Sequence, residues 1–109
     1  MSYRVKSIAV FERQAKRLIK KYASLKNELL TLVQELKHNP EQGTAIGDHC
    51  YKIRLAIVSK GKGKSGGARV ITTVVVRENS VYLLSIYDKS EKETLTDNEL
   101  RELLKHLPE

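Results

Sequence analysis

Residues 50–76 read CYKIRLAIVSKGKGKSGGARVITTVVV, and this stretch decides what kind of fold the chain can form. In its first part, apolar residues alternate with Lys52 and Arg54, a pattern typical of a half-buried strand. Its last part, ARVITTVVV, is rich in β-branched residues and predicts a second strand. The segment between them, SKGKGKSGG, offers no apolar surface to a core. We therefore expect two strands joined by a basic, glycine-rich connection.

The segments on either side extend this pattern. Residues 77–80 (RENS) predict a turn and residues 81–87 (VYLLSIY) a third strand, and such short connections favour an antiparallel meander. Residues 96–108 predict a helix, with Thr96 and Glu99 at the spacing of a capping box. Upstream, residues 11–36 have helical periodicity with a break near residues 20–28, where Ser24 could cap a second helix. Residues 5–10 could form a short strand, and residues 41–49 are expected to be a loop.

The predicted order of elements is β-α-α-β-β-β-α, in one domain that covers residues 1–109. This order predicts an α+β fold, in which the helices, above all the N-terminal helical hairpin, pack on one face of a mostly antiparallel, twisted sheet.

The composition limits the possible environments of the chain. It has a single cysteine, so no internal disulfide can form, and this favours a reducing compartment. Its start lacks the unbroken apolar stretch of a secretory signal, and no run approaches the length of a membrane span. We expect a cytoplasmic protein with no membrane partner.

The net charge of +7 points to an anionic partner. Residues 52–69 contain six basic residues and no acidic ones, and the rest of the chain holds 14 basic and 13 acidic residues. Because clustered like charges destabilise a fold, we expect this segment to bind a polyanion such as RNA. The alternative is a flexible, solubilising hairpin.

Two other kinds of site are disfavoured. Gly63-Lys64-Ser65 resembles part of a nucleotide-binding loop, but Val58 stands where that motif needs a glycine, and a strand follows instead of a helix. His49 and Cys50 are adjacent but have no further ligands at the spacing of a metal site. We therefore expect no metal and no cofactor.

RNA can be cleaved without a metal, because its own 2′-hydroxyl can attack the adjacent phosphorus. Such a site needs a base for that hydroxyl, cations for the charge on the phosphorane, and an acid for the 5′-oxygen. A lysine among other cations has its pKa pushed down, so we expect that a lysine of the basic segment, such as Lys62, can act as base or acid. If the third strand lies beside the second, Tyr87 and Lys89 at its end could face the basic segment. The alternative for Tyr87 is an aromatic residue that covers the core.

The residues of three stretches resemble a known family. These are LKHNPEQGTAIG (residues 36–47), residues 50–76, and VYLLSIYDKSEKETLTDNELREL (residues 81–103). Together they resemble the RelE/ParE toxin superfamily of type II toxin–antitoxin systems, and within it the HigB-like toxins. The middle stretch carries the most specific part of the resemblance.

The resemblance implies a RelE-like toxin that enters the ribosome and cleaves translated mRNA without a metal. Its partners would be the ribosome, mRNA and an antitoxin, often of the helix-turn-helix type. In this sequence, the implied catalytic residues are Arg69, Tyr87, Lys89 and Lys62, and the implied RNA-binding residues are Lys52, Arg54, Lys60 and Lys64. The last helix contains no tyrosine, unlike that of many relatives, so the resemblance leaves the acid and the base unassigned.

Two other functions remain open at this point. A ParE-like inhibitor of DNA gyrase would share the fold and cleave nothing. A non-catalytic RNA-binding module would be expected to expose more aromatic residues than a chain with one phenylalanine, five tyrosines and no tryptophan.

Overall fold

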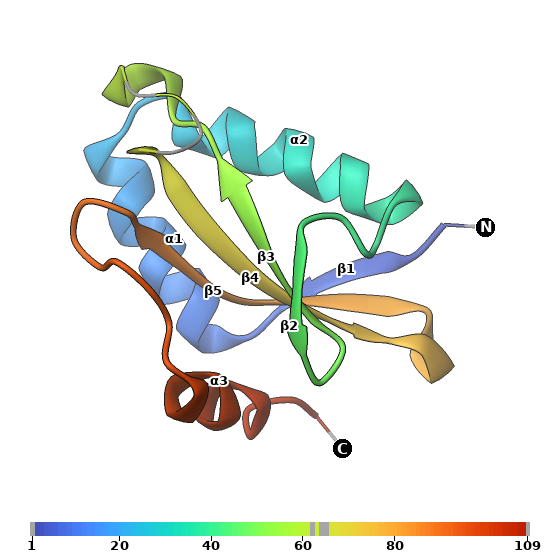
Figure 1. The fold of residues 1–109 in the computed structure, drawn as a ribbon. Helices are drawn as coiled ribbons and strands as arrows, with labels where there is room; N and C mark the ends of the chain where they lie inside the picture. Colours follow the sequence, from blue (N-terminus) through green and yellow to red (C-terminus); the bar gives the residue numbers. More distant parts are fainter. Residues whose placement is uncertain (1, 62, 64–65, 109) are drawn as a thin grey trace.

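The computed structural model describes residues 2–61, 63 and 66–108, so Lys62 and Lys64 lie outside the described residues. Over these residues the chain folds into a five-stranded sheet with three α-helices (Figure 1). The elements are β1 (Arg4–Ser7), α1 (Ala9–Lys21), α2 (Leu25–His38), β2 (Thr44–Gly47), β3 (Cys50–Leu55), β4 (Ala68–Val75), β5 (Ser80–Asp88) and α3 (Asp97–Leu104). Two short 3₁₀ helices, η1 (Val58–Lys60) and η3 (Val76–Glu78), follow β3 and β4.

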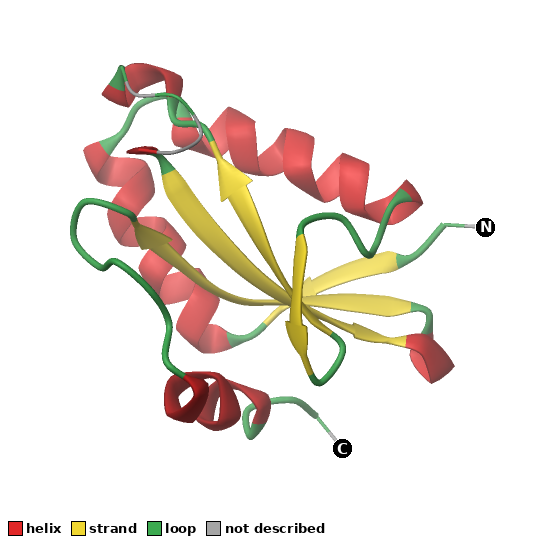
Figure 2. Cartoon of the chain, viewed as in Figure 1, coloured by secondary structure: helices red, strands yellow, loops and turns green. Residues whose placement is uncertain are grey.

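The strand order is β1-β5-β4-β3-β2, and every pair is antiparallel except β1 with β5 (Figure 2). The predicted meander of β3, β4 and β5 is therefore confirmed, and the fold is α+β as expected. The first strand is shorter than the predicted residues 5–10. The Ile8 N–H still donates to the Leu83 carbonyl at the edge of the sheet, but the Ile8 carbonyl already accepts from the Glu12 N–H and begins α1.

Strand β2 was predicted as part of a loop, and this prediction was wrong. Thr44–Gly47 pairs with β3 through a tight turn in which Asp48 and His49 both have positive φ, 53° and 60°. Such turns usually contain glycine or asparagine, so an Asp-His pair gives little signal in the sequence. Three of the four β2 residues are also exposed, so the strand lacks the apolar alternation that would reveal it.

The helical hairpin packs on one face of the sheet, as predicted. Helix α1 buries Phe11, Ala15 and Leu18, and α2 buries a leucine at each turn from Leu25 to Leu36. Ser24 precedes α2 but makes no capping hydrogen bond with its side chain, which contradicts its predicted role. Its hydroxyl lies 3.0 Å from the Ser59 hydroxyl and accepts from the Ser59 N–H instead.

The last helix covers the other face of the sheet, whereas we expected all helices on one face. Every residue of β5, and all but the last of β4, is buried, which requires cover on both faces. Helices α1 and α2 lie on one side of the strands and α3 on the other (Figure 1). The predicted capping box of α3 is confirmed, with Thr96 and Glu99 bonded reciprocally at 2.9 and 3.1 Å.

Candidate active site

Three predicted site residues lie in a row across one face of the sheet. Arg69 on β4 stands directly opposite Arg54 on β3 and directly opposite Tyr87 on β5. Residues that oppose each other on antiparallel strands point to the same face. The row lies where β3 and β5 end and β4 begins, and Figure 1 shows these three strand ends side by side. The structure thus places Tyr87 beside Arg69, at the end of the sheet from which the glycine–lysine segment leaves.

Tyr87 is buried, with 6% of its surface exposed, and its hydroxyl forms no hydrogen bond of normal geometry with any described residue. A buried hydroxyl without a partner is unusual in a folded protein and calls for an explanation, of which a catalytic role is one. Burial raises the pKa of Tyr87, and the charges of Arg69 and Lys92, together with the nearby backbone N–H of Leu95, oppose that rise. The hydroxyl therefore holds a proton at neutral pH beside two cations.

Arg69 is also buried, with 6% exposed. Its Nη1 donates to the carbonyl of Ala68 at 3.1 Å. A guanidinium is always protonated in proteins. Arg69 therefore brings a fixed positive charge beside Tyr87.

Lys52 and Arg54 extend this positive charge across β3. Being two residues apart on one strand, they point to the same face. Arg54 is exposed, and Lys52, half-buried, lines a hollow with Ile71 and the start of α3. The structure thus joins these two predicted RNA-binding residues to the row.

A groove of about 440 Å³ runs from Tyr87 along α3. It is lined by Gln14, Ser85, Tyr87, Lys92, Leu95, Asn98, Glu99, Glu102, Leu103 and His106. Sequence reasoning did not select Lys92 or His106 for this site. Only the packing of α3 against β5 brings them there, and the sequence carried no signal of that packing. Lys92 is held by Glu99 at 2.6 Å.

The structure places two other predicted residues differently. The Lys89 ammonium donates to the backbone carbonyl of Glu93 at 2.5 Å, so it is turned along the segment after β5. The side chain of Lys60 is only 8% exposed, and its ammonium lies 2.5 Å from a carboxylate oxygen of Asp88. Lys60 is thus nearly buried and its charge is paired with that of Asp88, and its predicted contact with RNA stays a prediction.

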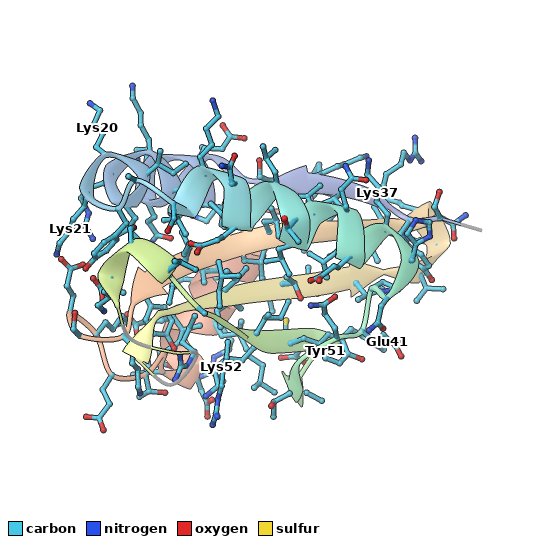
Figure 3. The ribbon with its side chains drawn as sticks, turned by 90° about the horizontal axis from the view of Figure 1, so that it is seen from above. Lys20, Lys21, Lys37, Glu41, Tyr51 and Lys52 are labelled. Carbon is cyan, nitrogen blue, oxygen red and sulfur yellow. The ribbon has the colours of Figure 1, made fainter. Side chains whose placement is uncertain are left out.

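A second basic surface was missed by the sequence count. Residues 4–26 hold eight basic residues and one acidic residue, and the acidic residues elsewhere had hidden this excess in the total. On α1, Arg13, Lys16 and Lys20 are exposed, and none of them forms an ion pair with another described residue. Figure 3 shows Lys20 projecting from α1 away from the sheet, on the opposite side of the molecule from Lys52. Counting charge by segment would have revealed this surface.

Among the described residues, no group of three or more histidine, cysteine, aspartate or glutamate side chains is placed to hold a metal ion. Cys50 is buried at the start of β3. None of the described helices is both long and apolar enough to cross a membrane.

The comparisons with known proteins agree with the fold and the predicted family. A family model described as the RelE toxin of the RelE/RelB toxin–antitoxin system matches residues 4–107. A double arginine-to-alanine mutant of the E. coli toxin RelE in the free state is 19% identical, with a TM-score of 0.62 over 99% of this chain and 100% of that chain. The isolated E. coli RelE toxin is 18% identical, with a TM-score of 0.58 over 97% and 100%.

A third solved structure is the same E. coli RelE mutant in complex with a peptide of the antitoxin RelBc. It is 20% identical, with a TM-score of 0.58 over 99% of this chain and 100% of that chain. At such identities these structures establish the similarity of the fold. The predicted resemblance to the RelE/ParE superfamily is confirmed, and the closer resemblance to HigB-like toxins stays a prediction.

Proposed function

Because this chain belongs to the RelE toxin family, we propose that it acts as the toxin of a toxin–antitoxin pair by cleaving mRNA on the ribosome. The observation that carries the proposal is the row of Arg54, Arg69 and Tyr87, which puts a buried hydroxyl without a hydrogen-bonding partner beside a buried guanidinium. A ParE-like gyrase inhibitor has no need of such a proton donor.

The reaction we propose is attack by the RNA 2′-hydroxyl on the adjacent phosphorus. The new bond closes a 2′,3′-cyclic phosphate, and the bond to the 5′-oxygen breaks to release a 5′-hydroxyl. Arg69 stabilises the negative charge that develops on the phosphorane, with Arg54 beside it. Removing one preorganised hydrogen-bond donor that stabilises such charge costs about 10²–10³ in rate in other enzymes.

In this scheme Tyr87 is the general acid. Burial raises the pKa of Tyr87, so the hydroxyl keeps its proton at neutral pH and can donate it to the departing 5′-oxygen. Because the Tyr87 hydroxyl already holds its proton at neutral pH, it is not available as the base, so the proton of the 2′-hydroxyl goes to another group. Our candidates for that base are Lys52, on the same face, and Lys62, in the glycine–lysine segment. Lys89 is the remaining predicted catalytic residue, and we assign it no separate step.

We assign two surfaces to the ribosome. Lys52, Arg54 and Lys64 would contact RNA on the side of the row. The exposed cations of α1 would contact ribosomal RNA phosphates on the other side. A toxin with both surfaces would be held between two RNA segments.

The antitoxin is the second partner that we propose. A solved relative, the E. coli RelE mutant, is bound to a peptide of the antitoxin RelBc. We expect this chain to form a complex with an antitoxin of its own, of the helix-turn-helix type, and to act in the cytoplasm, where ribosomes are. Copurification of an untagged antitoxin from its own operon with the tagged chain tests this partner.

The central test is cleavage of mRNA in cells that express the protein, followed by primer extension on a reporter. We expect discrete cuts in translated codons. Arg69→Ala should abolish them, with a loss of about 10²–10³ in rate on purified ribosomes. Arg77→Ala is the matched control, because Arg77 is an exposed arginine on η3, outside the row.

Three results would contradict the proposal. Growth arrest with intact mRNA and damaged DNA would favour a gyrase inhibitor. Cuts that persist in Arg69→Ala would remove Arg69 from the reaction. Cuts in naked RNA at the same rate as on ribosomes would remove the ribosome from the function.

A further inference from the structure

Asp88 is a buried carboxylate that binds three separate parts of the chain. It is the last residue of β5, and none of its side chain is exposed. It accepts four hydrogen bonds, from the Tyr22 hydroxyl (2.5 Å), the Lys60 ammonium (2.5 Å), the Ser90 N–H (2.9 Å) and the Ser90 hydroxyl (2.6 Å). These donors come from the end of α1, from η1 and from the turn after β5. One carboxylate therefore joins the helical hairpin, the sheet and the glycine–lysine loop, which we define as residues 59–67.

Both ends of the glycine–lysine loop are attached at Asp88 and its neighbour. At the first end, the Lys60 ammonium binds the Asp88 carboxylate. At the second end, the carbonyl of Gly67 accepts from the Lys89 N–H at 3.0 Å. Gly67 also passes so close to β3 that a Cβ would overlap the Leu55 carbonyl oxygen. The loop therefore leaves and re-enters the fold at the end of β5.

The start of the loop is also attached to the helical hairpin. The Glu28 carboxylate accepts from the Val58 N–H at 2.7 Å, and Ser24 and Ser59 bond to each other. These contacts fix residues 58 and 59 before any RNA binds, which lowers the entropy cost of binding at this end of the loop.

The position of Asp88 relative to the row gives these contacts a functional meaning. Side chains alternate along a strand, so Asp88 points to the hairpin face while its neighbour Tyr87 points to the opposite face, where the row lies. A shift of Asp88 would move the backbone that carries Tyr87. Burial by itself would raise the pKa of Asp88, but the hydrogen bonds from Lys60, Ser90 and Tyr22 outweigh it, and the pKa lies well below its usual range. The carboxylate is therefore charged at any pH at which the protein would work.

We propose that Asp88 is a positioning residue: through Lys60 it holds the first end of the glycine–lysine loop against the end of β5, and so fixes that end beside the backbone that carries Tyr87. This inference rests on the proposed function. It also gives Lys60 a role other than direct contact with RNA, since Lys60 acts on the loop through Asp88.

The test uses Asp88→Asn, which keeps the shape of the side chain and removes its charge. The control is Glu91→Gln, which makes the same chemical change three residues away at a carboxylate whose side chain is 37% exposed and pairs with Arg17 and Lys21. Single-turnover cleavage of ribosome-bound mRNA is measured over a range of toxin concentrations. Asp88→Asn should lower the saturating rate about 10–100-fold, as misplacement of reacting groups does.

The half-saturating concentration should change little in Asp88→Asn, because the loop keeps all its cations. Lys60→Met should give the same loss of rate, and the double variant no more than either single one, because both break the same contact. The double variant also removes both charges together, so it can be measured if a single variant does not fold.

Hydrogen exchange gives a second readout that does not depend on cleavage. The Gly61 N–H donates to Val58 and the Lys89 N–H to Gly67, and both hydrogen bonds belong to the attachment of the loop. Their exchange should become about tenfold faster in Asp88→Asn and stay unchanged in Glu91→Gln.

The results separate this inference from the proposed function. If the wild type cleaves no mRNA, the proposed function fails, and the exchange rates alone decide whether Asp88 holds the loop. If Asp88→Asn is less stable but cleaves at the wild-type saturating rate, its role is structural only and the inference is overturned. Additive losses in the double variant would also overturn it, because the two residues would then act separately.

Discussion

Tyr87 and Asp88 are adjacent residues at the end of β5, and both are buried, yet their polar atoms differ in hydrogen bonding. The Asp88 carboxylate accepts hydrogen bonds from three residues, whereas the Tyr87 hydroxyl has no hydrogen-bonding partner among the described residues. Strand alternation points them to opposite faces of the sheet. The same stretch of strand therefore carries a satisfied polar cluster on one face and an unsatisfied group on the other.

The difference helps to distinguish structural from functional polar groups. A buried polar group that is fully bonded holds one arrangement of the chain, so its removal costs folding free energy and releases the segments that it positioned. A buried polar group without a partner costs stability as it stands, so its presence needs another explanation, such as a partner in a complex. We therefore expect changes at Asp88 to affect stability strongly and changes at Tyr87 to affect it hardly at all.

The largest expected effect on stability is that of Asp88→Asn. It leaves the Lys60 ammonium buried without its counter-charge, and breaking a buried ion pair in this way costs about 3–5 kcal/mol of unfolding free energy. Urea unfolding at neutral pH measures this loss. Glu91→Gln, which breaks exposed pairs, should cost less than about 1 kcal/mol.

The effect of Asp88 should also depend on pH in a defined direction. The pKa of Asp88 is lower in the folded chain than in the unfolded chain, so the unfolded chain takes up a proton first as the pH falls. The stabilisation is complete above the ordinary aspartate pKa of about 3.9 and is lost progressively below it. The difference between wild type and Asp88→Asn should stay constant near neutral pH and shrink in acid. A constant difference down to pH 2 would contradict this assignment.

Tyr87→Phe should have the opposite profile. Its hydroxyl has no partner to lose, so the unfolding free energy should stay the same or rise slightly. If the hydroxyl donates the proton to the 5′-oxygen, the single-turnover cleavage rate should fall about 100-fold, equal to about 2.7 kcal/mol in the barrier.

Tyr82→Phe is the matched control on the same strand. The Tyr82 hydroxyl donates to a carboxylate oxygen of Glu78 at 2.9 Å, at the other end of β5. Its loss should cost about 1 kcal/mol of stability and leave cleavage unchanged. If Tyr87→Phe lost stability and kept its activity, the contrast between the two faces of β5 would be wrong.

Much of the fold could be predicted because its signals are local. The leucines of α2, the alternation of β3 and the capping box of α3 each lie within a few residues of one another. Strand β2 could not be predicted, because its pairing depends on a turn with two left-handed non-glycine residues, Asp48 and His49. The side of the sheet that α3 covers depends on long-range packing, which periodicity does not report.

In the candidate site, too, local contacts could be predicted from the sequence and long-range contacts could not. The pairing of β4 with β5 follows from short connections, so the meeting of Arg69 with Tyr87 could be foreseen. The burial of Lys60 could not, because its counter-ion lies 28 residues further along the chain. The basic surface on α1 was missed because the charge outside residues 52–69 was counted as one total. That total combined a basic N-terminal part with acidic segments elsewhere.

The smallest effect that we expect is on ribosome binding, when the exposed cations of this basic N-terminal part are replaced. Helix α1 covers the face of the sheet opposite to the row (Figure 1), so its exposed cations should contribute affinity for RNA and nothing to the chemical step. Replacing Arg13, Lys16 and Lys20 together with alanine should weaken binding to ribosomes about tenfold and reduce the dependence on salt, because each lost phosphate contact lowers the slope of log K against log salt by about 0.7–0.9. Cosedimentation at several salt concentrations measures both quantities.

The same experiment distinguishes a specific surface from a general effect of net charge. A control variant removes the same charge from exposed positions elsewhere: Arg77, Arg101 and Lys105 to alanine. Alanine favours helix, so neither α1 nor α3 should unfold. If both triple variants lose the same affinity, ribosome binding responds to total charge, and α1 is not a second contact. If only the α1 variant loses affinity while its saturating cleavage rate stays at the wild-type value, binding and catalysis lie on opposite sides of the sheet.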